Sequence, residues 1–187
     1  MRKIIITIIC VTFLSAISNA QEKLNINVST SSIKWIGEYT FNFGGHDGFI
    51  NLTEGYFIKT GAIITGGEFI IDMNSITNTD IKKKKGKESL VNHLKEPDFF
   101  GVKEHPFAKL TITKVHYGKE AHVWVEANLT LKKVTKPIGF RAEFNYDKKQ
   151  MTTRFKIDRK EWNVNYKSKF KNGAISDAIG FEVTLNL

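Results

Sequence analysis

Hydrophobic and polar residues alternate along most of this chain, which is typical of strands with one buried face. In residues 33–43, Trp35 and Tyr39 share one parity with isoleucine and phenylalanine, while Lys34 and Glu38 take the other. The same rule predicts eight strands, at residues 33–43, 48–58, 63–73, 107–117, 121–131, 136–146, 150–159 and 179–187.

Two of these strands carry more specific expectations. In residues 48–58 the alternation places Ile50, Leu52, Tyr56 and Ile58 inward. In residues 107–117 the apolar parity changes near Thr113, which predicts a β-bulge, since one extra residue reverses the side-chain direction.

Residues 86–106 break the strand pattern. Leu90, Val91 and Leu94 have helical spacing, and Pro97 ends the helix. The following turn carries two adjacent phenylalanines, at 99 and 100. A short apolar helix in an all-β chain must pack on the sheet or cover its end, so we expect this segment to act as a lid.

Amphipathic strands joined by short turns form either a sandwich or an up-and-down barrel. We favour an eight-stranded antiparallel up-and-down barrel with a short helical insert after the third strand, because its inward set is rich in aromatic residues. Such a barrel is filled by side chains or holds one small ligand. An outer-membrane barrel fits less well, because the outward parity is charged at Lys34, Glu68 and Arg154.

Residues 1–20 have the features of a cleaved secretory signal peptide, with Arg2 and Lys3 before an apolar run and small residues up to Ala20. A retained membrane helix is the alternative, but it needs roughly 20 apolar residues. Residues 21–187 are then one domain of a periplasmic or otherwise exported protein. Because Cys10 lies in the leader, that domain lacks disulfides and thiol catalysis.

The chain is basic, with a formal net charge of +9 at pH 7. This charge favours anionic surfaces such as phosphate headgroups, but a solvated basic face that aids solubility explains it equally well. We therefore expect at most peripheral contact with a membrane. Nucleic-acid binding is disfavoured, because the aromatic residues share the inward parity and are not displayed for stacking.

The chain contains no nucleophile elbow, no phosphate-binding loop and no H-E-x-x-H zinc motif. His93, Asp98 and His105 could meet as metal ligands, but their spacing does not place them on one helical face. Helix packing and local hydrogen bonding are the favoured roles of these residues, and no metal or cofactor is expected.

Several short segments match a known family in their order and spacing. They are Ile33-Lys34-Trp35, His46-Asp47-Gly48, Thr65-Gly66-Gly67, His93-Leu94, Asp98-Phe99-Phe100, Leu129-Thr130-Leu131, Val134-Thr135-Lys136-Pro137 and Ile157 to Arg159. On these segments the chain resembles the YceI-like family, polyisoprenoid-binding proteins with a lipocalin-like barrel. It departs from the family at Lys133, His105 and Trp162-Asn163, which lie in predicted turns.

The resemblance implies an exported barrel, often dimeric, that holds an isoprenoid lipid without catalysis. The ligand would be a polyprenyl quinone or a polyprenyl phosphate, which the protein stores or transports. Ten residues are expected to form the apolar wall: Trp35, Phe41, Phe43, Phe69, Ile71, Leu94, Phe99, Phe100, Phe140 and Phe155. Lys136 and Arg159, and the lysines at 82–85, are candidates for contacts with a polar head.

Two alternatives stay open from the sequence. The first is a barrel with a filled core that binds another protein of the cell envelope, for instance under stress. The second is a lipid-modifying enzyme that uses His93, Asp98 or His105. We rank lipid binding first, because the inward aromatic parity and the export signal agree with the resemblance.

Overall fold

The structure is a computed structural model, and it describes residues 20–40, 43–118, 122–166 and 175–187. Residues 1–19 of the expected signal peptide lie outside the described residues, as do Phe41 and Ala121. In the described ranges, no helix has both the length and the hydrophobicity needed to cross a membrane.

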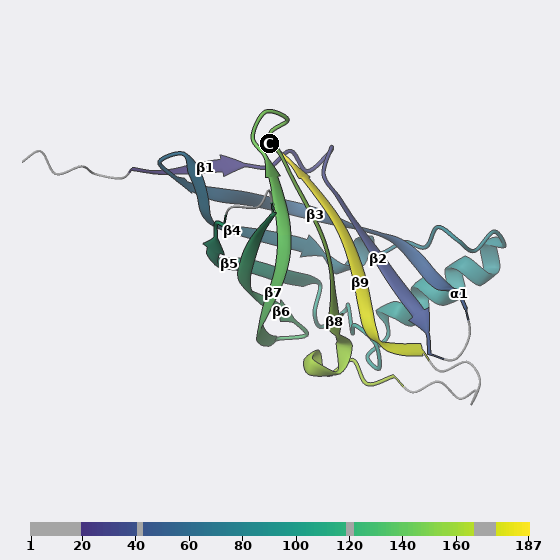
Figure 1. The fold of residues 1–187 in the computed structure, drawn as a ribbon. Coiled ribbons are helices and arrows are strands. Elements are labelled where there is room, and N and C mark those ends of the chain that lie inside the picture. Colours follow the sequence, from purple (N-terminus) through teal and green to yellow (C-terminus); the bar gives the residue numbers. More distant parts are fainter. Residues whose placement is uncertain (1–19, 41–42, 119–121, 167–174) are drawn as a thin grey trace, which may run out of the picture.

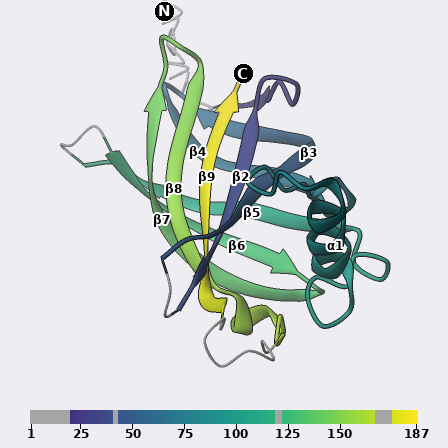
Figure 2. The ribbon, with the colours of Figure 1, turned by 90° about the vertical axis from the view of Figure 1, so that its right-hand side faces the viewer.

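Within the described residues, eight strands, β2 to β9, form a closed antiparallel barrel with up-and-down connections (Figures 1 and 2). Each strand pairs with the next one along the chain, and β9 pairs with β2 to close the ring. The elements are β1 Gln21–Asn25, β2 Ser32–Tyr39, β3 Gly45–Thr60, β4 Ile63–Asp72, η1 Met73–Ser75, α1 Lys84–Lys95, β5 Phe107–His116, β6 His122–Leu131, β7 Val134–Asn145, β8 Gln150–Asp158, η2 Arg159–Trp162 and β9 Ile175–Asn186. The predicted barrel and its helical insert are confirmed.

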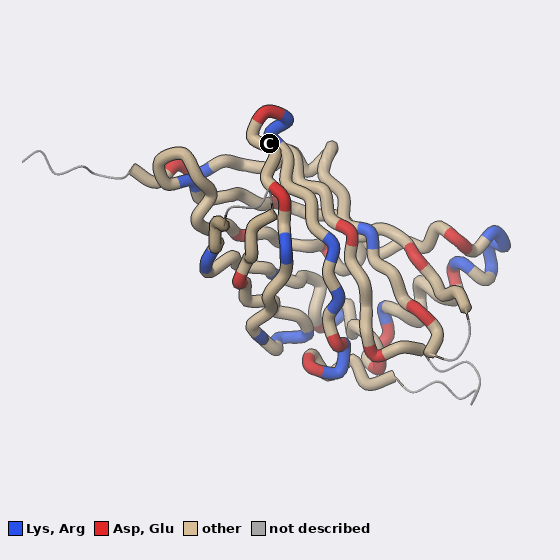
Figure 3. The backbone as a smooth tube through the Cα atoms, in the orientation of Figure 1, with Lys and Arg blue, Asp and Glu red and all other residues tan. Residues whose placement is uncertain are grey.

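The alternation of buried and exposed residues follows the prediction on most strands. On β6, Val123, Val125 and Ala127 are buried, and the residues between them are exposed. Charged residues occur along the strands as well as in the loops (Figure 3). Lys34 forms an outer ion pair with Asp47 at 3.1 Å. The apolar side chains therefore face the interior.

The first strand, β1, was not predicted from the sequence. It pairs antiparallel with the second half of β3, from Gln21 opposite Thr60 to Asn25 opposite Tyr56. Its sequence, QEKLN, has one apolar residue and is largely exposed, so no alternation marks it. Strand β2 pairs with the first half of β3, so β1 extends the same edge beyond β2.

A bulge in β3 overturns part of the predicted inward set. Ile50 and Leu52 are buried as expected, but the register with β4 shifts between Leu52 and Glu54. One extra residue reverses the side-chain direction. Phe57 is therefore the buried residue, at 1% exposure. The prediction that Tyr56 and Ile58 point inward is wrong. The bulge predicted near Thr113 is confirmed by a register shift between Ile112 and Lys114.

Helix α1 lies at the end of the barrel where β2 ends and β3 begins (Figure 1). Leu94 is buried, and Leu90 packs against the core. The Glu96 N–H donates to the carbonyl of His93 at 3.1 Å as the helix ends, and Pro97 follows. The helix thus presents its apolar side to the barrel, as its spacing predicted.

Candidate functional site

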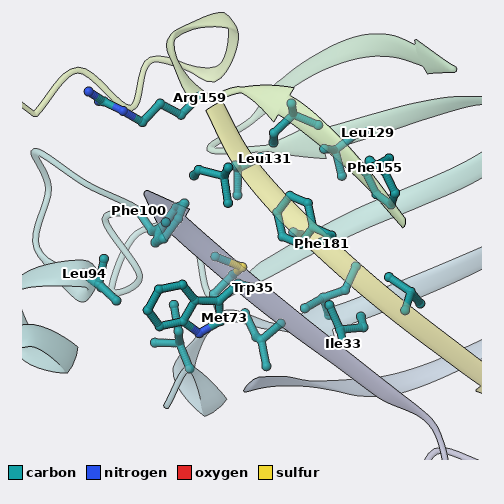
Figure 4. Close-up of a pocket in the computed structure, with 18 of the residues that line it drawn as sticks. Ile33, Trp35, Met73, Leu94, Phe100, Leu129, Leu131, Phe155, Arg159 and Phe181 are labelled. Carbon is teal, nitrogen blue, oxygen red and sulfur yellow. The ribbon is translucent and has the colours of Figure 1, made fainter. Parts of the chain in front are cut away.

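The barrel encloses a cavity of about 330 Å³. All eight barrel strands and α1 contribute side chains to its wall, part of which Figure 4 shows. Besides the predicted residues, the wall includes Ile33, Leu52, Met73, Leu129, Leu131, Met151, Phe181 and Val183. Few polar side chains interrupt this surface, so the cavity suits an apolar molecule.

Most of the residues predicted for the wall do line the cavity: Trp35, Phe69, Ile71, Leu94, Phe99, Phe100, Phe140 and Phe155. The prediction for Phe43 is wrong, because its side chain is fully exposed, at 108%. Strand β2 ends at Tyr39 and β3 begins at Gly45, so Phe43 lies in the turn, where strand parity no longer applies. Phe41 lies outside the described residues.

Three aromatic rings on neighbouring strands form a continuous part of the wall. Phe140 on β7 stacks on Phe155 on β8, with ring centroids 4.7 Å apart. Phe155 also contacts Phe181 on β9 at 5.4 Å. Phe140 is 3% exposed, whereas Phe155 and Phe181 are half-buried. These rings supply a broad apolar surface on one side of the cavity.

The interior beyond the cavity is packed, and we call this part the closed end. Phe57 contacts Phe69 at 5.0 Å and Phe144 at 5.5 Å, both edge-to-face. Ile64 is buried beside this cluster, and Tyr117 Oη donates to its carbonyl at 2.9 Å. Phe57, Phe144 and Ile64 do not line the cavity.

Two tyrosines pair at the closed end. The hydroxyl groups of Tyr117 and Tyr146 are 3.0 Å apart. Burial raises the pKa of Tyr117, and the hydrogen bond with Tyr146 raises it further. The Tyr117 hydroxyl therefore stays protonated, and its hydrogen bonds to Tyr146 and Ile64 help to fix the closed end.

At the opposite end, which we call the open end, lining residues are also exposed to solvent. They include the polar side chains of Tyr39, His46, His93 and Tyr166. The side chains of His46 and His93 are 31% and 35% exposed. Within the described part of the chain, this mixture of cavity contact and exposure marks the mouth of the cavity.

Three polar residues at the open end form a hydrogen-bonded chain. Tyr39 Oη is 3.0 Å from His46 Nε2, and His46 Nδ1 is 2.8 Å from Asp80 Oδ2. Tyr39 shares the inward parity of β2, so the sequence contained a signal for it. Asp80 lies in a loop without periodicity, and Tyr166 follows η2, so nothing in the pattern identified either residue.

Arg159 lines the cavity, and its side chain is 4% exposed, but local contacts already occupy its guanidinium. Its Nε donates to the Ser176 carbonyl at 3.2 Å, and Nη1 donates to the Val164 carbonyl at 2.5 Å. Nη2 pairs with Asp177 at 3.0 Å. The side chain thus ties η2 to the start of β9.

The other predicted head-group contacts lie away from the cavity wall. Lys136 is 44% exposed and pairs with Glu161 at 3.5 Å. Lys84, at the start of α1, is 89% exposed. Neither Lys136 nor the lysines at 82–85 line the cavity.

His93 lines the cavity and packs among aromatic rings. It lies 4.5 Å from the Tyr166 ring and 5.5 Å from the Phe99 ring, both edge-to-face. His93 Nε2 is 3.4 Å from Asp98 Oδ2. Across the described ranges, no group of three or more potential metal ligands occurs. The contacts of His93 agree with the packing role that the sequence favoured.

A half-buried lysine, Lys132, holds the turn after α1. Lys132 Nζ donates to the carbonyls of Pro97 at 2.9 Å, Phe99 at 2.8 Å and Asn163 at 3.1 Å. Burial lowers the pKa of Lys132, while the nearby Asp98 carboxylate raises it. Because Phe99 lines the cavity, Lys132 fixes this part of the wall from outside.

Comparisons with known proteins agree with this fold. A family profile described as a YceI-like domain matches residues 16–187. A curated UPF0312 protein of Pseudomonas putida (strain W619) is 43% identical over 53 residues, a segment that covers 28% of each chain. The match therefore spans less than a third of that relative's length.

Two solved structures share the architecture. BcnA of Burkholderia cenocepacia superimposes with a TM-score of 0.65 at 15% identity, covering 86% of this chain and 98% of that protein. The YCEI protein of Campylobacter jejuni gives 0.52 at 21% identity, covering 81% and 84%. At these identities the likeness concerns the fold.

Proposed function

Because the chain belongs to the YceI-like family, we propose that it binds an isoprenoid lipid in its barrel as a non-catalytic carrier or store. The observation that carries this proposal is the cavity of about 330 Å³ with its apolar wall. Small-molecule sites span roughly 300–1,000 Å³, so the volume is that of a binding site.

An isoprenoid chain has no hydrogen-bonding groups, so its affinity must come from apolar surface removed from water. That burial contributes roughly 25 cal/mol per Å² before ordering costs. The wall meets this requirement with stacked Phe140 and Phe155 on one side and with Phe69 and Leu94 elsewhere. The hollow interior also favours ligand binding over the filled-core alternative.

We also propose that residues 1–20 direct export, so that the barrel works outside the cytoplasm. The support is the leader composition, with Arg2 and Lys3 before an apolar run that ends in small residues. Cell fractionation tests this directly. Recovery of the unprocessed chain in the cytoplasm would contradict it.

Lipid extraction from the purified protein, followed by mass spectrometry, tests the proposed function. We expect a long isoprenoid lipid in about one copy per barrel. Ala108→Phe fills part of the cavity and should abolish retention. The control is Ala142→Val, because Ala142 is buried but does not line the cavity.

Circular dichroism shows whether each variant is folded. Retention by folded Ala108→Phe, or a wild-type protein that neither carries nor takes up any isoprenoid, would contradict lipid binding in this cavity.

A further inference from the structure

We propose that Tyr39, His46 and Asp80 form a head-group site that accepts an uncharged hydroxyl group of the bound lipid and disfavours a phosphate. This inference rests on the proposed function and names the class of ligand, an isoprenoid alcohol or phenol. The site lies at the open end, where the rings of Tyr39 and His46 both line the cavity.

The carboxylate of Asp80 is held in place from several directions. Its Oδ1 accepts hydrogen bonds from the backbone N–H of Asp47 at 3.0 Å and from Asn78 Nδ2 at 2.5 Å. Its Oδ2 is 2.8 Å from His46 Nδ1. Burial raises the pKa of Asp80, but the hydrogen bonds from His46, Asp47 and Asn78 outweigh burial and lower it overall.

With a neutral His46 ring, this arrangement sets the direction of each hydrogen bond. An ionised carboxylate only accepts, so His46 Nδ1 carries the proton, and in the neutral ring Nε2 is then the acceptor. Tyr39 Oη, 3.0 Å from Nε2, then donates a hydrogen bond to this neutral ring. The lone pairs of the Tyr39 oxygen are left as acceptors for a ligand hydroxyl.

A lipid hydroxyl needs such a partner. A buried hydroxyl that loses its hydrogen bonds to water and gains none is costly, and most of this cavity wall is apolar. Tyr39 offers an acceptor at the mouth while the isoprenoid tail fills the interior. The head is thereby placed at the open end and the tail toward the closed end.

A phosphate head is poorly matched to the same surface. Among the described lining residues, Arg159 is the one lysine or arginine, and its guanidinium is tied to Ser176, Val164 and Asp177. Glu38 also lines the cavity and is paired with Lys156 at 2.9 Å. Among the described lining residues, an anionic head would therefore meet the carboxylate of Glu38 and no free cation to pair with.

The test compares three ligands of equal chain length on the full chain freed of lipid: a polyprenol, the polyprenyl monophosphate and the headless hydrocarbon. We expect the wild type to prefer the polyprenol to the phosphate. Tyr39→Phe should weaken polyprenol binding about tenfold, the effect of one lost hydrogen bond, and leave the hydrocarbon unaffected.

Asp80→Asn should also weaken polyprenol binding, because it removes the carboxylate that sets the His46 tautomer. The control is Tyr56→Phe, which removes a hydroxyl outside the cavity, where Lys23 covers the ring.

The outcomes separate the two claims. Equal polyprenol affinity in wild type and Tyr39→Phe, or tighter binding of the phosphate than of the polyprenol, would overturn the head-group site and leave lipid binding intact. Binding of none of the three ligands would overturn the proposed function and this inference with it.

Discussion

Lys132 Nζ donates a hydrogen bond of 2.8 Å to the carbonyl oxygen of Phe99, a residue of the cavity wall. The same ammonium group bonds to the carbonyls of Pro97 and Asn163. A single side chain in the turn between β6 and β7 therefore holds both the segment after α1 and the end of η2. Lys132 itself does not line the cavity, so the segment predicted to be a lid is held by contacts from outside the cavity.

Lys132→Met should loosen this lid. Losing hydrogen bonds to a charged donor is expected to cost about 1–3 kcal/mol and to speed ligand release several-fold, while the barrel stays folded. Stopped-flow displacement of a fluorescent lipid measures the release rate. Lys133→Met is the matched control, because Lys133 is exposed. Unchanged release in Lys132→Met would show that this contact does not limit opening.

The closed end and the cavity wall should respond differently to the loss of an aromatic ring. Phe57 is 1% exposed and packs against Phe69 and Phe144, so Phe57→Ala should cost about 3–5 kcal/mol in the free energy of unfolding. Phe155 faces the cavity, so Phe155→Ala should destabilise less and weaken ligand binding more. Urea unfolding and lipid titration of both variants test this contrast.

Gly48 allows β3 to approach the loop before α1. A Cβ at this position would lie 1.9 Å from the Thr77 carbonyl oxygen, which accepts a hydrogen bond of 2.9 Å from Trp35 Nε1. Gly48→Ala should therefore force the backbones apart and cost roughly 2 kcal/mol or more. Gly66→Ala is the control, because its nearest neighbour is the flexible end of Ile58, at 3.4 Å. Equal unfolding midpoints would contradict this expectation.

Asp47 should make stability depend on acid pH. Its carboxylate accepts a hydrogen bond from Thr79 and pairs with Lys34. The Thr79 hydrogen bond lowers the pKa of Asp47 most, burial opposes it, and Lys34 lowers it further. Because the folded pKa lies below the ordinary value of 3.8, the stabilisation is complete above that value and is lost as the pH falls through the folded pKa.

Asp47→Asn should therefore lose less thermal stability than the wild type between about pH 6 and about pH 3. Asp147→Asn, in the exposed turn between β7 and β8, is the control and should keep the wild-type acid dependence. Parallel acid dependence of the melting temperature in wild type and Asp47→Asn would rule out this contribution.

Much of the cavity wall could be predicted, because alternation with a period of two is a local property. Trp35 and Phe140 are inward for the same reason that their strands form. Phe57, and not Tyr56, points into the barrel, because one extra residue in the bulge reverses the direction of the side chains after it. The amino-acid composition of the strand gives no sign of that extra residue. Arg159 was identified as a contact residue, but its guanidinium is bound to β9, a partner that spacing does not reveal.

The sequence by itself determined the class of fold, the short helix α1 and an interior rich in aromatic residues. The reason is that the hydrophobic effect acts on each element through its own pattern of apolar and polar residues. Only the tertiary structure decided which end is packed and which is open. It also joined Tyr39, His46 and Asp80, since a hydrogen-bonded site between a strand, its neighbour and a distant loop depends on how the barrel closes.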